Sequence, residues 1–415
     1  MTTSWVPGAD ASDYSAVVLP YGVALVGPSA ERHVVTRIGD SVLDLHTLTD
    51  SGPVGSDFSG VLTAGSLNPL LAAGRPTWTR LREALTSWVS DPAHQAQVHP
   101  HLSPLVDATM ALPFEVADYV DFYSSEQHAK NVGQIFRPDS PGLPDNWKHL
   151  PIGYHGRSGT VVVSGTPIVR PNGQRKPRNA IEPTFGPSQR LDIEAEVGFV
   201  VGTPTDLGTR VSTAALADHV FGVVLVNDWS ARDLQAWEYV PLGPFLGKSF
   251  ATSIAAWVVP LDALAEARRP LPAQDPVVFD YLRDDDPWCL DLRLAVDLNG
   301  TVVSEPPFAT QYWSPGQQLA HLTVNGASLR TGDLFASGTV TGPERHQRGS
   351  FLELSWGGRE PFTLDDGSQR TFLEDGDTVS ISGWAPGSGG SRIGLGEVVG
   401  TVRRSPSSTP QGPAT

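Results

Sequence analysis

The sequence predicts a mainly β protein of the α+β class with two domains, and three observations support this prediction. A chain of 415 residues is longer than one ordinary domain. Its 42 glycines and 36 prolines favour turns and short strands over bundles of long helices. The clustered polar side chains all follow residue 115. We therefore expect an N-terminal β-rich domain over residues 1–115, a second domain that carries the chemistry over 116–404, and a disordered Ser/Pro tail over 405–415.

The overall composition excludes several classes of function. The net charge is −16 and no basic stripe is present, so nucleic acid is not an expected partner. The single cysteine, Cys289, excludes an internal disulfide and a cysteine-based metal site. Residues 1–13 lack the features of a signal peptide, and no apolar run reaches the length of about 18 residues that a membrane helix needs. We therefore expect a cytoplasmic protein without a membrane partner.

The first region contains two candidate strands and one helix. Residues 22–26 and 33–45 read as strands that are joined by a turn at 28–30. A helix is then predicted to start after Pro76 and to end at Pro92. Its apolar residues recur at helical spacing and are predicted to be core: Trp78, Leu81, Leu85, Trp88 and Val89.

A second helix is expected near residue 124, where the character of the sequence changes. Ser124 and Gln127 have the spacing of a capping box, which places His128 in the first turn. A helix N-terminus disfavours a protonated imidazole and so keeps His128 available as a base. A purely structural histidine is the alternative. The nearby Asp121, Tyr123 and Arg137 favour a site.

Residues 191–201 are predicted to form a strand that carries two acidic side chains. Residues two apart in a strand face the same side, so Glu194 and Glu196 point together. Two adjacent carboxylates in an apolar segment are costly unless a cation lies between them. A solvated strand face is the alternative, and the apolar run that follows at 197–201 argues against it.

The stretch 226–252 holds the densest mixture of charged, amide and aromatic side chains. An apolar run at 223–226 leads to Asp228 at the end of a strand. Arg232, Gln235, Tyr239 and Lys248 follow. The prolines and glycines between 241 and 247 predict a non-helical loop. Such a loop can hold a metal beside an anionic ligand, and a loop stabilised by internal ion pairs is the alternative.

The rest of the chain reads mainly as strands and turns. We expect a strand at 255–260, an exposed connection at 264–275 and a hairpin at 292–304 around Asn299-Gly300. A helix within 311–322 and a short strand with a glycine corner at 331–339 follow. Residues 350–356 read as an apolar strand in which Glu353 must be paired. Residues 387–396 read as a turn, because they lack the strand–helix context of a phosphate loop.

The predicted site residues suit metal-assisted attack of water on a carbonyl. The carboxylates Asp121, Glu194, Glu196 and Asp228 offer oxygen ligands typical of Ca²⁺ or Mg²⁺, with Mn²⁺ possible. His128 can take a proton from water while Glu353 orients its ring. Arg232, Gln235 and Lys248 are donors for an oxyanion and for an enolate leaving group.

These motifs resemble the fumarylacetoacetase family. The resemblance rests on D-F-Y-S-S-x-Q-H at 121–128, the pair Glu194-x-Glu196, N-D-W-S-A-R-D at 227–233 and W-E-Y-V-P-L-G-P-F-L-G-K-S-F at 237–250. It covers nearly the whole chain. It implies an SH3-like N-terminal barrel, a C-terminal mixed β-sandwich roll and a homodimer. It also implies hydrolysis of the carbon–carbon bond of 4-fumarylacetoacetate to fumarate and acetoacetate, the last step of tyrosine and phenylalanine degradation.

The resemblance also implies a role for each matching residue. Asp121, Glu194, Glu196 and Asp228 would hold the divalent metal, and Lys248 and Thr252 would line a second, weaker cation position near Asp228. His128 would be the general base with Glu353 as its partner, and Arg232, Gln235 and Lys248 would stabilise the oxyanion and enolate. Tyr123, Arg137, Gln235, Tyr239 and Thr339 would contact the substrate. Pro138 and the loop 343–349 depart from the family pattern.

Two other functions remain as alternatives at this stage. The first is another acylpyruvate or β-diketone hydrolase, decarboxylase or isomerase of the same superfamily. The long N-terminal region and the set Tyr123, Arg137 and Tyr239 argue against it. The second is a noncatalytic β protein that a metal stabilises, which would cleave no diketone.

Overall fold

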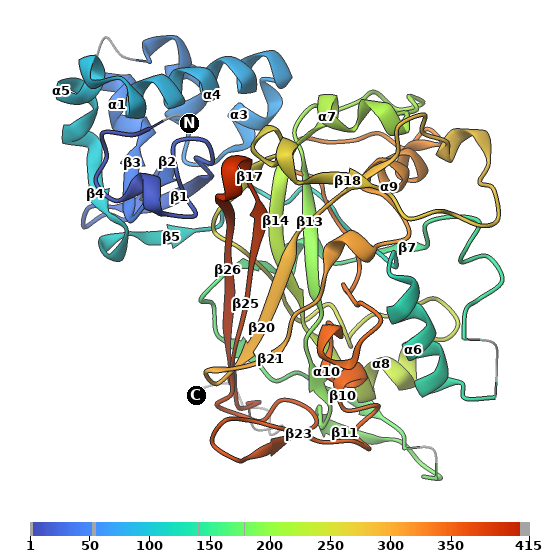
Figure 1. The fold of residues 1–415 in the computed structure, drawn as a ribbon. Coiled ribbons are helices and arrows are strands. Elements are labelled where there is room, and N and C mark those ends of the chain that lie inside the picture. The colour runs from blue at the N-terminus through green and yellow to red at the C-terminus, as the bar shows by residue number, and fades with distance from the viewer. Residues whose placement is uncertain (1–2, 52–54, 140–141, 178, 407–415) are drawn as a thin grey trace, which may run out of the picture.

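The computed structural model describes residues 3–51, 55–139, 142–177 and 179–406, and it has a mixed α/β fold with several sheets. The N-terminal elements gather at one end of the long strands β13, β14, β25 and β26 (Figure 1). From residue 407 onward, the predicted tail lies outside the described residues. None of the helices in the described ranges is long and apolar enough to cross a bilayer.

The N-terminal sheet has five strands in the order β4-β3-β2-β1-β5. Their bounds are β1 Tyr21–Val26, β2 Glu31–Ile38, β3 Ser41–Asp44, β4 Leu102–Pro104 and β5 Thr109–Ala111. All pairings in this sheet are antiparallel. The strand predicted at 33–45 is therefore two strands, separated by a turn at Gly39 with a φ of 55°. An SH3-like barrel stays a prediction for this region.

Five α-helices of the described residues accompany this sheet: α1 Leu45–Ser51, α2 Ser59–Leu62, α3 Asn68–Ala72, α4 Arg75–Ser90 and α5 Gln95–Val98. Helix α4 confirms the predicted helix, and every residue of its predicted apolar stripe is buried. The other four are too short to show a periodic apolar pattern in the sequence.

An eight-stranded mixed sheet forms the centre of the second region. Its path is β7-β6-β22-β13-β14-β16-β8, and β17 also pairs with β14. The strands are β6 Tyr119–Phe122, β7 Gly153–His155, β8 Val161–Val163, β13 Ala195–Val201, β14 Val220–Asp228, β16 Thr252–Ile254, β17 Val259–Pro260 and β22 Leu334–Ala336. The pairs β6–β22 and β8–β16 are parallel. This order brings β6, β13 and β14 close together, and each of them carries a predicted metal ligand.

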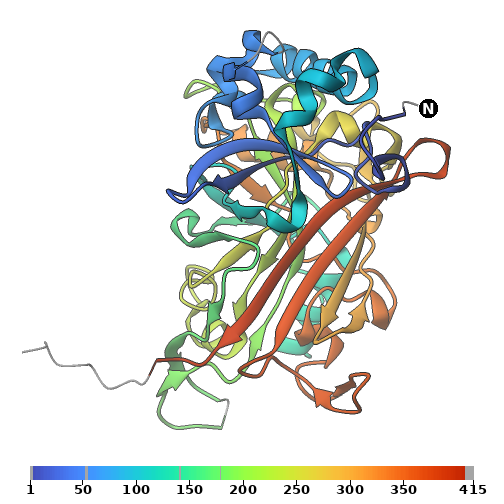
Figure 2. The same cartoon turned by 90° about the vertical axis from the view of Figure 1, so that its left-hand side faces the viewer.

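A second sheet of five strands packs against the central one. Its order is β21-β20-β25-β26-β9, with β9 Ile168–Val169, β20 Arg293–Leu298, β21 Thr301–Ser304, β25 Thr378–Pro386 and β26 Arg392–Arg403. One buried core contains apolar side chains of both sheets, among them Leu225 and Val398. In Figure 2, β25 and β26 run side by side toward the N-terminal elements.

Two predicted turns in this second sheet are confirmed. Asn299 and Gly300 join β20 to β21 with φ values of 54° and 88°, as a tight hairpin turn requires. The glycine-rich segment 387–396 contains the turn between β25 and β26.

Short elements complete the fold. The two-stranded sheets pair β10 Asn172–Arg175 with β11 Thr184–Pro187, β12 Leu191–Asp192 with β15 Ser230–Ala231, β18 Arg268–Pro270 with β19 Trp288–Leu290, and β23 Phe362–Thr363 with β24 Gln369–Arg370. Helix α7 is Leu216–His219, and α9 is Pro315–Thr323 with a capping box from Ser314. Residues 264–275 are not only an exposed connection, because Leu264 is buried and β18 pairs with β19. The strand expected at 255–260 is confined to β17.

Three local predictions near the site are wrong. Helix α6, Glu126–Phe136, is capped by Ser125 instead of Ser124, and the Ser125 side chain accepts from the His128 backbone N–H. Residues 232–238 form helix α8, Arg232–Glu238, because the breakers lie only after it. Residues 351–354 form the one-turn helix α10, Phe351–Leu354, instead of a strand, because Ser350 caps it.

Gly338, which follows β22, has a φ of 76°, and a Cβ atom there would lie 2.1 Å from the carbonyl oxygen of Phe122. Gly367 has a φ of 83° with nothing within 4 Å of a Cβ atom. We expect Gly367→Ala to cost about 1–2 kcal/mol of unfolding free energy from the left-handed backbone alone. Gly338→Ala should cost about 1–3 kcal/mol more, because β6 must move. Denaturant unfolding measures both values, and equal losses would contradict the predicted steric clash.

Candidate metal centre and active site

The structure brings the four predicted metal ligands together. Asp121 lies on β6, Glu194 directly precedes β13, Glu196 lies on β13 and Asp228 is the last residue of β14. One carboxylate oxygen from each lies within 4.8 Å of the others, and all four side chains are buried. The strand predicted at 191–201 is interrupted at residues 193–194, so Glu194 reaches the cluster from the bend between β12 and β13.

The protein's own cations balance only part of this negative charge. The Lys248 ammonium contacts Glu194 and lies 2.8 Å from Asp228 Oδ2. Within the described residues, Asp121 Oδ1 and both oxygens of Glu196 are buried without a hydrogen-bond partner. Burial and the neighbouring carboxylates raise the pKa values of Asp121 and Glu196 well above their usual range. A hard divalent cation fits these oxygen atoms, because it would relieve the repulsion and satisfy the unpaired atoms.

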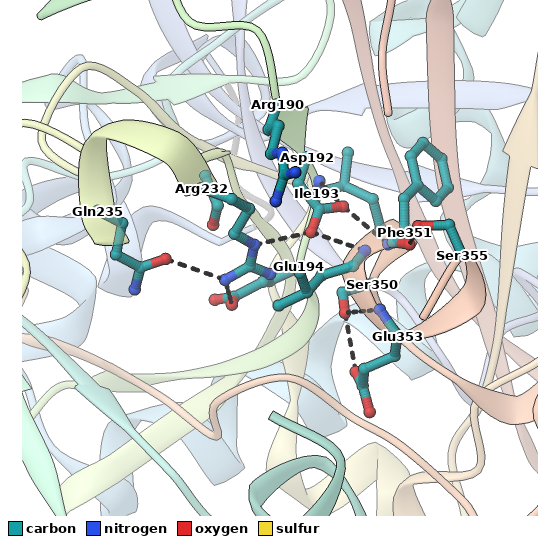
Figure 3. Close-up of polar contacts among 12 residues, drawn as sticks. Arg190, Asp192, Ile193, Glu194, Arg232, Gln235, Ser350, Phe351, Glu353 and Ser355 are labelled. Atoms are coloured by element: carbon teal, nitrogen blue, oxygen red, sulfur yellow. Dashed lines mark hydrogen bonds and ion pairs between the residues drawn. The ribbon is translucent and has the colours of Figure 1, made fainter. Parts of the chain in front are cut away.

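Arg232 contacts Glu194 Oε1, the carboxylate oxygen that Lys248 does not contact. Its Nε donates to Asp192 Oδ2 at 2.7 Å, and its Nη1 lies 2.7 Å from Glu194 Oε1. Nη1 also donates to Gln235 Oε1 at 3.2 Å (Figure 3). Burial alone raises the pKa of Glu194, but Lys248 and Arg232 outweigh burial and hold it far below the usual value. Glu194 is therefore ionised, whether or not a metal is bound.

Asp192 is a site residue that sequence reasoning missed. Besides Arg232, it accepts hydrogen bonds from the backbone N–H groups of Phe351 at 2.7 Å and Leu352 at 3.0 Å (Figure 3). It thereby joins Arg232 to the start of α10. A signal for it was present, since Asp192, Glu194 and Glu196 repeat with the two-residue period of a strand.

His128 forms a buried pair with Glu353. His128 Nδ1 lies 2.7 Å from Glu353 Oε2, which also accepts from Ser350 Oγ at 2.8 Å. Glu353 Oε1 accepts from Asn131 Nδ2 at 2.9 Å. Burial raises the pKa of Glu353, but His128 and these hydrogen bonds outweigh burial and lower it. Because an ionised Glu353 can only accept, Nδ1 carries a proton and Nε2 is the basic nitrogen.

A cavity of about 520 Å³ is lined both by members of the carboxylate cluster and by His128 of the His128–Glu353 pair. The predicted site residues that line it are Asp121, Tyr123, His128, Arg137, Glu194, Arg232, Gln235, Tyr239, Lys248 and Thr339. Glu196, Asp228, Thr252 and Glu353 are buried behind this wall. Thr252 Oγ1 donates to Asp228 Oδ1 at 2.9 Å, so Lys248 and Thr252 share Asp228 as a partner. The cavity size is typical of a site for a small molecule.

Tyr154 is a second residue that sequence reasoning missed. It lies on β7 directly across from Asp121 on β6, lines the cavity and donates to Asp228 Oδ2 at 3.4 Å. Only the pairing of β6 with β7 reveals Tyr154, and no local motif marks it.

The loop 343–349 contacts the helix that carries Glu353, because Arg348 Nη1 donates to the backbone oxygen of Glu353 at 2.8 Å.

Comparison with known proteins gives one consistent result. The Fumarylacetoacetase N-terminal family matches residues 18–113, and the Fumarylacetoacetate (FAA) hydrolase C-terminal family matches residues 118–403. The fumarylacetoacetase of Homo sapiens is 45% identical over 412 residues, covering 96% of this chain and 98% of that protein. The fumarylacetoacetase of Caenorhabditis elegans is 46% identical over 414 residues, with the same coverage.

Solved structures share the fold at much lower identity. A fumarylacetoacetate hydrolase from Exiguobacterium antarcticum superposes with a TM-score of 0.54 at 16% identity and covers 93% of this chain and 99% of its own. A maleylpyruvate hydrolase from Sphingobium gives a TM-score of 0.51 at 14% identity and covers 93% of this chain and 100% of its own. At these identities the likeness concerns the fold alone.

The carboxylate cluster predicts that a divalent cation stabilises the protein. In protein stripped with a chelator, we expect Ca²⁺ or Mg²⁺ at about 100 times its dissociation constant to add about 2.7 kcal/mol to the unfolding free energy. Glu196→Gln should abolish this gain. It should not destabilise the stripped protein, because the substitution removes the repulsion of Glu196 by Asp121, Glu194 and Asp228.

Thermal or denaturant unfolding measures these changes. Glu83→Gln, an exposed substitution on α4, is the matched control and should respond to the cation as the unaltered protein does. An undiminished cation response in Glu196→Gln would contradict the assignment.

Proposed function

This chain belongs to the fumarylacetoacetase family, and we propose that it is a hydrolase that cleaves the carbon–carbon bond of 4-fumarylacetoacetate to give fumarate and acetoacetate. This reaction would be the last step of tyrosine and phenylalanine degradation. The observation that carries the proposal is that one cavity is lined by His128, which is paired with the buried Glu353, and by Asp121 and Glu194 of the four clustered carboxylates. Identity of about 45% over 96% of the chain to the human fumarylacetoacetase supports the same reaction.

His128 is the proposed general base. Its Nε2 takes a proton from a water molecule as the water oxygen attacks the carbonyl carbon of the fumaroyl half, and Glu353 stabilises the imidazolium that forms. The bond between the two halves then breaks, and its electron pair goes to the enolate of acetoacetate. The imidazolium gives its proton to the enolate carbon, which completes acetoacetate and returns His128 to its neutral state.

The cavity wall supplies donors for the negative charge that develops. A divalent cation held by the four carboxylates would polarise the diketone oxygens as a Lewis acid. Lys248 adds an ammonium close to Glu194 and Asp228. Gln235 accepts from Arg232 through Oε1, which leaves its amide nitrogen as a donor. We assign the oxyanion and enolate to Arg232, Gln235 and Lys248.

Substrate contacts are assigned to Tyr123, Arg137, Gln235, Tyr239 and Thr339, all of which line the cavity. Thr339 supports this assignment, because its buried hydroxyl has no partner in the described part of the chain. A buried unpaired hydroxyl is costly unless a ligand satisfies it. Tyr239, at 36% exposure, stands at the mouth of the cavity.

Further features of the proposal follow from the family. We propose that the native metal is Ca²⁺ or Mg²⁺, that Lys248 and Thr252 line a second cation position at Asp228, and that the enzyme is a cytoplasmic homodimer. We also propose that residues 1–115 form an SH3-like barrel and residues 116–404 a catalytic β-sandwich roll. No membrane or nucleic-acid partner belongs to this function.

Turnover of the diketone tests the proposal directly. We expect purified protein to remove the diketone absorbance of 4-fumarylacetoacetate, to lose this activity with a chelator and to regain it with Ca²⁺ or Mg²⁺. Acylpyruvates should turn over more slowly, because they offer fewer groups to Tyr123, Arg137 and Tyr239. Faster turnover of an acylpyruvate would favour a related hydrolase, and no cleavage of any diketone would favour a noncatalytic protein.

Removal of the His128 side chain should slow turnover strongly without unfolding the protein. We expect His128→Ala to lower kcat by about 10²- to 10⁴-fold. The fold and the cation response should persist, because Asn131, Ser350 and Thr341 still donate to Glu353. The double variant His128→Ala/Glu353→Gln should lose little more than the single one, since the pair acts as a unit.

The exposed His99 offers a matched control, and His99→Ala should leave kcat unchanged. Near-normal turnover in His128→Ala would remove His128 from the mechanism.

A further inference from the structure

A second cavity, of about 480 Å³, adjoins the catalytic one. Phe136 at the end of α6, together with Arg232 and Ala236 on α8, lines both cavities. The second cavity is also bordered by four further cationic side chains and one carboxylate: Arg175, Lys176, Arg190 and Arg359, with Asp233. This concentration of positive charge is unusual in a protein with a net charge of −16.

Across the described ranges, none of the four cations Arg175, Lys176, Arg190 and Arg359 forms an ion pair with a carboxylate. Arg190 lies over the ring of Phe372 at 5.6 Å, and Lys176 lies over the ring of Trp237 at 5.3 Å. Arg175 and Arg359 donate to backbone oxygens.

The carboxylate of Asp233 is already occupied. It accepts hydrogen bonds from Ser188 Oγ at 2.6 Å and from the backbone N–H of Gln189 at 2.7 Å. Like charges gathered in one cavity repel one another, so an anion that enters it gains their combined attraction.

Arg232, which borders both cavities, gives a second indication of a ligand. Its side chain is only 3% exposed, and Nε and Nη1 are taken by Asp192, Glu194 and Gln235. Nη2 is buried and has no partner among the described residues. A buried charged donor without a partner is costly, and Arg232 borders the cationic cavity.

We propose that this cavity binds a small polyanion, a molecule with two or more carboxylate or phosphate groups, at a site separate from the substrate. Its volume is typical of small-molecule sites. Guanidinium groups bind both anions with paired hydrogen bonds. The anion acts on catalysis through Arg232, because the same guanidinium holds Glu194 and Gln235 on the catalytic side. It therefore changes kcat rather than competing with substrate.

Calorimetric titration of the Mg²⁺-loaded enzyme with succinate and, separately, with inorganic phosphate tests the site. The variant Arg190→Ala/Arg359→Ala removes two of its cations. The control Arg268→Ala/Arg392→Ala removes the same charge from two exposed arginines that lie over tryptophan rings elsewhere. We expect saturable binding that weakens by at least about tenfold in the first variant and is unchanged in the control.

Either anion supports the proposal, and the one that binds more tightly identifies the chemical class. Equal binding in the first variant, or no binding tighter than about 10 mM in the unaltered enzyme, would overturn it. Purely competitive inhibition would place the anion in the catalytic cavity and would also overturn it. The titration needs no turnover, so a failure of the proposed reaction would not be mistaken for a failure of this site.

Discussion

The excess of buried negative charge at the centre of the second region is the constraint on which the rest of the structure depends. Among the described residues, Asp192 and the four clustered carboxylates are paired with two buried cations, Arg232 and Lys248. With all five carboxylates ionised, three negative charges would remain, and a divalent cation would reduce this to one. Without such a cation, burial and repulsion raise the pKa values of Asp121 and Glu196. Strand β6 lies far in the sequence from the paired strands β13 and β14, and bringing their carboxylates together is costly unless cations or bound protons offset the repulsion.

The two halves of the site are mechanically connected. Arg232 holds Glu194 on the metal side and Asp192 on the other, and Asp192 accepts from the first backbone N–H groups of α10. The same short helix carries Glu353, which fixes the ring of His128. A displacement of Glu194 would therefore reach His128 through charge-assisted hydrogen bonds, which are stronger than neutral ones, and through the backbone of α10.

The sequence allowed the members of the site to be predicted but not their supports. Carboxylates at strand ends and at two-residue spacing identify Glu194, Glu196 and Asp228 because burial forces such groups to be paired. By contrast, α8 and α10 are short helices that local propensity does not reveal. Helix α8 has no side-chain N-cap, and the first N–H groups of α10 bond to Asp192, which is distant in the sequence. Tyr154 meets the site only through the pairing of β6 with β7, which no local pattern reveals.

The positions of the buried cationic side chains explain how an acidic protein can bind an anionic substrate. With a net charge of −16, long-range attraction of an anionic substrate is absent, so positive charge must act at short range and under partial burial. Arg232 and Lys248 provide this charge at the cavity, and they are held in place by Glu194 and Asp228 of the carboxylate cluster that could hold a metal ion. Because the ion pairs fix their geometry in advance, little reorganisation is needed when charge develops on the substrate. Arg232 is the most constrained of these groups, since three of its neighbours orient a single planar guanidinium that borders two cavities.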